Sequence, residues 1–159
     1  MNYFLKIAAL ATCILTLLIL PAAAKEAPAS ADDLVKKLKQ ALQTKDQGAA
    51  LALVCWDGVS PDMKTQQEMP FHTVFDEIGQ GQQLSSVKTG PLTPDAPVEM
   101  VLNGVKYHPN VKVLGIIHVM LDEDTNPTEF VFCYGKNENG YWLAAMVEAK
   151  TSENTDDKK

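Results

Sequence analysis

The sequence predicts an α+β domain in which N-terminal helices pack on a curved antiparallel β-meander. Apolar residues recur at helical spacing between residues 32 and 78. Segments rich in β-branched and aromatic residues then follow between residues 84 and 148, bounded by Gly, Pro, Asn and Asp. Helices first and consecutive strands afterwards are typical of an α+β fold rather than an alternating α/β fold.

Four helical segments are expected, over residues 32–42, 48–56, 61–69 and 71–78. Ser30 and Ser60 have the side chains that cap helix N-termini, and Pro61 suits the first helical position. Pro70 lacks a backbone N–H, so we expect it to break or kink the helical pattern between the third and fourth segments.

The strands are expected over residues 84–88, 98–102, 105–108, 111–122, 129–134 and 141–148. The dipeptide Asn103-Gly104 is a strong signal for a two-residue hairpin turn. Short connections between consecutive strands favour antiparallel neighbours, which gives the meander.

Composition limits the classes of protein to which this chain can belong. It has 159 residues, 46% of them hydrophobic and 21% charged, which fits one globular domain. The net charge is −6 and every basic residue is lysine. A phosphate backbone would be repelled, and the bidentate grip of arginine is missing, so we expect no nucleic-acid partner.

Residues 1–24 have the pattern of a cleaved secretory signal peptide. Lys6 precedes an apolar run that ends at Leu20, and Pro21 and three alanines follow. The run is too short to span a bilayer comfortably, so we expect cleavage after Ala24. The mature protein would then be periplasmic or secreted and have no stable membrane anchor. An uncleaved anchor is the alternative.

The folded domain is expected to cover residues 32–149. Residues 25–31 form a polar leader of small residues, and residues 150–159 form a charged tail. Neither segment carries enough apolar surface to offset the entropy of ordering it, so we expect the leader to be flexible and the tail to be disordered.

Two segments carry a resemblance to a known superfamily. They are the helix-turn-helix pattern of residues 41–53 and the closing hairpin of residues 130–143. Both resemble the nuclear transport factor 2-like superfamily, which includes the SnoaL-like cyclases. The resemblance implies a cone-like curved sheet around the helices, room for a pocket inside the cone, and dimerisation across the outer sheet face. It implies no particular chemistry, because catalytic and structural members share the fold.

The candidate ligand-binding residues are Trp56, Asp57 and His72. In an enzyme, Asp57 near the mouth of the cone would act as a general base whose pKa is raised by Trp56. The simpler interpretation, which we favour, is that Asp57 ends a helix in an Asp-Gly turn. The three histidines have no second ligand at local spacing, so we assign no metal site, no cofactor and no catalytic residue.

Two functional hypotheses follow from these residues. The first is an exported, non-enzymatic binding or interaction module whose ligand, a small molecule or another partner, is unknown. The alternative is a SnoaL-like isomerase, dehydratase or cyclase that acts on a small apolar molecule in the cone pocket, with Asp57 and a histidine. We favour the first because the sequence contains no convincing catalytic constellation.

Two cysteines remain after signal cleavage, and an oxidising compartment favours a Cys55–Cys133 disulfide. Two buried free thiols are the alternative. An inward-facing Cys133 would place Val131 inside, and pairing the strands by their turns would put Ile117, Val119 and Leu121 on the same inner side. The outer sheet face would then be apolar, which predicts a homodimer. The predicted interface residues are His118, Met120, Phe132, Tyr134 and Trp142. If the faces are reversed, the aromatic residues line the cone instead.

Overall fold

The computed structural model describes residues 27–92 and 99–149. The predicted signal peptide, the first two residues of the predicted leader and the predicted tail lie outside these residues. Within the described ranges, none of the helices has the length and apolar character that crossing a membrane requires.

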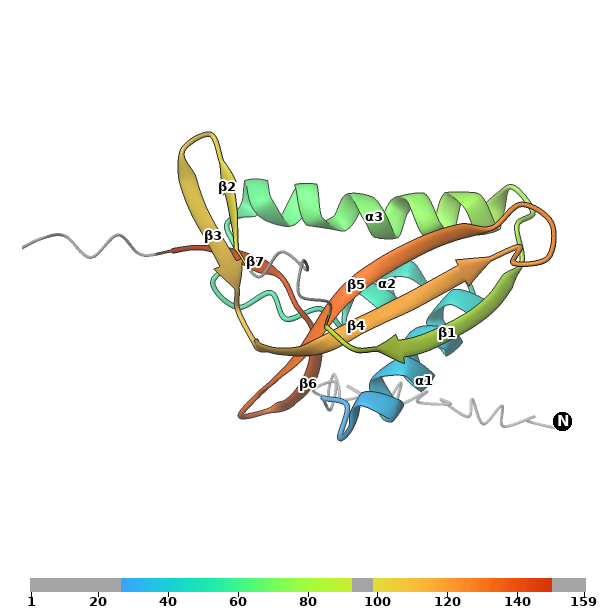
Figure 1. Cartoon of the computed structure of the whole chain (residues 1–159), viewed down its shortest axis with the longest axis horizontal. Helices are drawn as coiled ribbons and strands as arrows, with labels where there is room; N and C mark the ends of the chain where they lie inside the picture. Colours follow the sequence, from blue (N-terminus) through green and yellow to red (C-terminus); the bar gives the residue numbers. More distant parts are fainter. Residues whose placement is uncertain (1–26, 93–98, 150–159) are drawn as a thin grey trace, which may run out of the picture.

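The predicted α+β class is confirmed, because helices are followed by a curled antiparallel sheet that forms a half-barrel (Figure 1). The helices are α1 (Ala31–Gln43), α2 (Gln47–Leu51) and α3 (Pro61–Gly79). The strands are β1 (Leu84–Gly90), β2 (Met100–Leu102), β3 (Val105–Pro109), β4 (Lys112–Leu121), β5 (Thr128–Asn137), β6 (Gly140–Leu143) and β7 (Met146–Glu148).

The helices begin where the sequence predicts caps. Ser30 Oγ accepts a hydrogen bond from Asp33 N–H at 3.1 Å, and Ser60 Oγ accepts one from Met63 N–H at 3.4 Å. The buried stripe of α1 consists of Leu34, Leu38, Ala41 and Leu42, at the spacing of one helix face.

Two helix predictions need correction. The predicted helices over residues 61–69 and 71–78 form one continuous helix, α3, with Pro70 inside it. Pro70 is exposed, while Met63 and Phe71 on either side of it are buried, so packing holds the helix together across the missing N–H. The helix predicted over residues 48–56 ends at Leu51, because Val54 instead makes a parallel bridge with Leu143.

The strands form two sheets. The larger has the order β1-β4-β5-β6, and the smaller has the order β2-β3-β7. The segment predicted as one strand over residues 141–148 is therefore divided between the two sheets. The Gln67 side chain on α3 accepts from Met146 N–H at 2.6 Å and donates to Met146 O at 3.0 Å, which joins α3 to the smaller sheet.

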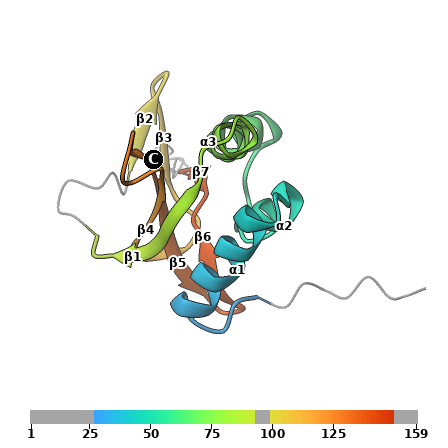
Figure 2. The same cartoon turned by 90° about the vertical axis from the view of Figure 1, so that its right-hand side faces the viewer.

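The core lies between the three helices and one face of the larger sheet (Figure 2). Ile117, Val119 and Leu121 of β4 are completely buried there. They alternate along the strand as the sequence pattern predicts, because successive side chains of a strand point to opposite faces. Among the described residues, no helix lies on the outer face of the larger sheet.

The faces of β5 are the reverse of those predicted. Phe132 pairs with Ile117 across the strands, so the two side chains share the helix-facing side, and the Phe132 ring stacks on Phe71 with centroids 4.7 Å apart. Val131, predicted to point inward, is 52% exposed. The prediction took the faces of β5 from the assumed disulfide, so the error in one carried over to the other.

The predicted Cys55–Cys133 disulfide is not formed, and both residues are free thiols. Cys55 N–H donates to Leu143 O at 3.0 Å, whereas Cys133 O accepts from Ala144 N–H at 2.8 Å. The end of β6 therefore runs between the two cysteines. Neighbouring strands lie about 4.8 Å apart, so a strand between the two cysteines separates their Cα atoms by roughly 9 to 10 Å. This distance exceeds the limit of about 7 Å for a disulfide.

Candidate functional site

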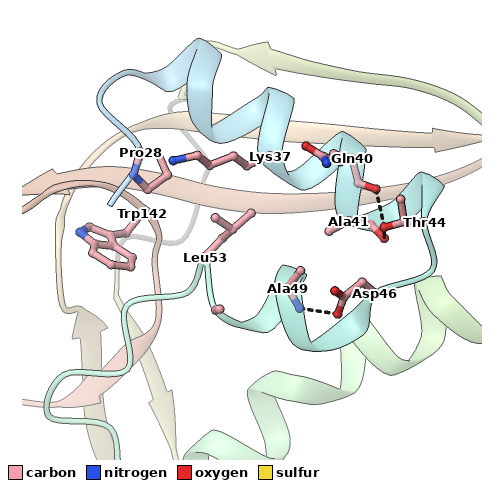
Figure 3. A pocket seen from close by; sticks show the side chains of 10 residues that line it. Pro28, Lys37, Gln40, Ala41, Thr44, Asp46, Ala49, Leu53 and Trp142 are labelled. Carbon is pink, nitrogen blue, oxygen red and sulfur yellow. Dashed lines mark hydrogen bonds between the residues drawn. The ribbon is translucent and has the colours of Figure 1, made fainter. Parts of the chain in front are cut away.

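A half-open groove of about 360 Å³ lies between α1, the α2 region and β6 (Figure 3). Its walls are mainly apolar, and its polar groups lie on α1 and at the start of α2. The lining residues are Pro28, Lys37, Gln40, Ala41, Thr44, Asp46, Ala49, Ala52, Leu53 and Trp142.

The helical repeat explains how α1 and α2 build two walls of this groove. Lys37, Ala41 and Thr44 are four and three residues apart, so they lie along one face of the chain as α1 ends. Asp46 begins α2, its Oδ1 accepting from Ala49 N–H at 2.8 Å. The small side chain of Ala49 then leaves the space between the two helices open.

Trp142 forms the end wall of the groove, and a hydrogen bond fixes its indole ring. Its Nε1–H donates to Asn137 Oδ1 at 3.0 Å. Tyr141 N–H donates to Pro28 O at 3.0 Å, which places buried Pro28 beside the indole. Pro28 belongs to the segment predicted as the leader, and its side chain is buried.

Gly140 allows this close approach of the N-terminal segment. Its φ is +141°, and a Cβ atom there would lie 2.8 Å from both Ala27 Cβ and Pro28 O. A side chain at this position would push the segment away from β6. The hairpin glycine is thus part of what shapes the Trp142 end of the groove.

The two ends of the groove differ in charge. The Lys37 side chain extends along α1 toward the end that holds Pro28 and Trp142, while Asp46 lies at the opposite end (Figure 3). The Lys37 ammonium contacts an Asp33 carboxylate oxygen at 3.1 Å. The hydrogen bond from Lys37, followed by one from Ala29 N–H, lowers the pKa of Asp33 below its ordinary value.

The predicted residues Trp56, Asp57 and His72 do not form one site. Trp56 Nε1–H donates to Leu51 O at 2.9 Å, at the end of α2. His72 is exposed on α3 and bonds through Nδ1 to the Gln47 side chain at 2.7 Å, at the start of α2. Asp57 is exposed in the turn before Gly58, whose φ is +76°. None of the three lines the groove.

The predicted interface residues are divided among three places. His118 and Met120 lie on the outer face of the larger sheet, where His118 bonds to Glu129. Phe132 and Tyr134 pack against the core instead, which corrects the prediction for them. Trp142 lines the groove together with Pro28 and Leu53, which are far away along the chain.

The arrangement of the groove suits binding. Thr44 Oγ1 donates to Gln40 O at 2.9 Å, and Asp46 caps α2, so these polar groups have structural partners. Over residues 27–92 and 99–149, no three His, Cys, Asp or Glu side chains lie close enough to hold a metal ion. Comparison with protein-family models, with curated proteins and with solved structures finds no match to this chain.

Proposed function

We propose that this protein is an exported, non-enzymatic binding module that holds a small, largely apolar molecule in the groove. The observation that carries the proposal is the anchored indole of Trp142 at the end of an apolar hollow. A ring held rigidly by a hydrogen bond on its edge offers a flat apolar face at little entropic cost. The volume of the groove lies within the range of small-molecule sites.

Among the described residues that line the groove, no acid and base lie side by side, which supports binding over catalysis. Lys37 and Asp46 lie at opposite ends, and each has a partner of its own. The SnoaL-like alternative needs Asp57 and a histidine to converge in the cone. Asp57 and His72 are exposed near different ends of α2, and Phe71 and Phe132 stack between α3 and the sheet.

We also propose that the architecture belongs to the nuclear transport factor 2-like superfamily and that the chain is exported. Helices followed by a curled antiparallel sheet are compatible with such a cone. Export rests on the signal pattern of residues 1–24.

Titration with phenylnaphthylamine, a neutral apolar dye that fluoresces when it leaves water, tests the binding function. Trp142→Ala removes the stacking face and should weaken dye binding about ten-fold. Ala49→Phe should block the groove and abolish binding.

Trp56→Phe is the matched control, because it alters the other tryptophan, which lies outside the groove. Binding in this variant should equal that of the wild type. The proposal fails if Trp142→Ala and Ala49→Phe bind the dye as the wild type does. Equal weakening by Trp56→Phe would instead favour the site predicted around Trp56 and Asp57.

A further inference from the structure

The α1 wall of the groove carries a segment rich in lysine. Residues 34–45 contain four lysines and no acidic residue, and Asp33 and Asp46 flank them, in a chain whose net charge is −6. Lys36, Lys37 and Lys39 lie on α1, and Lys37 lines the groove. The Lys37 ammonium is the positive charge at the Trp142 end of the apolar hollow, where it favours ligands that carry a negative group.

We propose that the groove selects amphipathic anions, with the apolar body of the ligand against Trp142 and its anionic group at Lys37. This inference rests on the proposed binding function of the groove. Lys37 extends toward the Trp142 end, so one molecule can meet both residues (Figure 3). The opposing carboxylate of Asp46 lies at the far end, where it repels the anionic group least.

The existing pair between Lys37 and Asp33 is compatible with an incoming anion. Asp33 Oδ2 also accepts a hydrogen bond from Ala29 N–H at 3.1 Å, so Asp33 keeps a partner when Lys37 turns to the ligand. Both side chains of the pair are partly exposed, and ion pairs in contact with water contribute little to stability, so Lys37 can exchange this partner for a ligand. The four-carbon stem of Lys37 adds apolar contact along the groove wall.

Two dyes with the same aromatic body separate the charge effect from the apolar effect. Phenylnaphthylamine is neutral, and anilinonaphthalene sulfonate carries one sulfonate. Lys37→Gln should weaken binding of the sulfonate by about five-fold and binding of the neutral dye by less than about two-fold. Salt at about 1 M should weaken only the sulfonate, since the Debye length is then about 3 Å.

Lys106→Gln is the matched control, because it removes the same charge from an exposed residue of β3 outside the groove. Near-ultraviolet circular dichroism of each variant shows whether its core is intact, so that dye binding to a loosened core is recognised. Equal effects of Lys37→Gln and Lys106→Gln on the sulfonate, or no salt effect on the wild type, would overturn anion selection. In that case the proposed function stands if Trp142→Ala still weakens binding of the neutral dye. If Trp142→Ala has no effect on the neutral dye, the groove is not the binding site.

Discussion

Asn110 joins three segments of the chain through its side chain. Its Nδ2–H₂ group donates to Cys55 O at 2.6 Å and to Asp57 O at 3.0 Å. Its Oδ1 accepts from Ala145 N–H at 3.1 Å. The amide therefore replaces strand pairing where the turn after α2, the β3–β4 connection and the β6–β7 connection meet.

Asn110→Ala should lower the free energy of unfolding by about 2 to 3 kcal/mol. It removes three hydrogen bonds and leaves partly buried backbone groups without a partner. Urea denaturation measures the loss. Asn139→Ala, at an exposed turn residue, is the control and should stay within about 0.5 kcal/mol of the wild type. Similar losses in both variants would show that the Asn110 amide does not hold these segments.

The two thiols make stability depend on alkaline pH. Burial raises the pKa of Cys55 and of Cys133 above the ordinary thiol value of 9.0. As the pH rises above about 9, the unfolded chain loses these protons before the folded chain does, so the folded state loses stability. Urea unfolding at about pH 8 and about pH 10 should show this loss.

The loss should be smaller in the double variant Cys55→Ala and Cys133→Ala, since other groups that titrate at high pH remain. Alkylation after denaturation, read by intact mass, should modify both cysteines of the wild type. A pH dependence identical in the two proteins, or a mass that shows a disulfide, would contradict the structure.

At the scale of elements, patterns that depend on near neighbours were predictable. The turn at Asn103 and Gly104 has φ angles of 53° and 81° and connects β2 to β3 as expected. Ile117, Val119 and Leu121 stand at every second position of β4, and all three are buried on the predicted side. The turn dipeptide and the alternation of apolar residues both depend on residues that are close together in the sequence.

Elements whose form depends on distant partners were not predictable in the same way. The run from Phe130 to Cys133 is apolar at every position, so a period of two cannot choose its buried face. Val54 lies in an apolar run that suits a helix, yet its bridge with Leu143 makes it extended. The groove depends on contact between the N-terminal segment and β6, which no local pattern specifies.

The faces of β5 can be tested with two neighbouring residues. Phe132→Ala should lower the free energy of unfolding by about 3 kcal/mol or more, because it removes a ring that stacks on Phe71 in the core. At concentrations where the chain is monomeric, Val131→Ala should change it by no more than about 0.5 kcal/mol, since Val131 is on the exposed side of the protomer. Thermal or urea unfolding of both variants gives the comparison. The reverse order would restore the faces predicted from the sequence.

At the scale of the whole molecule, the three helices of the described residues cover one face of the larger sheet, and none of them lies on its outer face (Figure 2). Val131 is 52% exposed on this outer face. Lys88 on β1 and Glu129 on β5 lie on either side of β4 on this same face. The face therefore combines an exposed apolar side chain with opposite charges on its two flanks.

We propose that a second copy of the chain covers this outer face. A two-fold axis along β4 places β1 of one protomer opposite β5 of its partner, which brings Lys88 toward Glu129 across the interface. Gel filtration with light scattering should find a dimer at micromolar concentration. Val131→Asp should convert the dimer to a monomer, because the interface would have to bury a charged carboxylate. Val101→Asp, at a residue 64% exposed on β2 of the smaller sheet, should leave the dimer intact. A wild-type monomer, or a dimer that survives Val131→Asp, would show that this face does not mediate association.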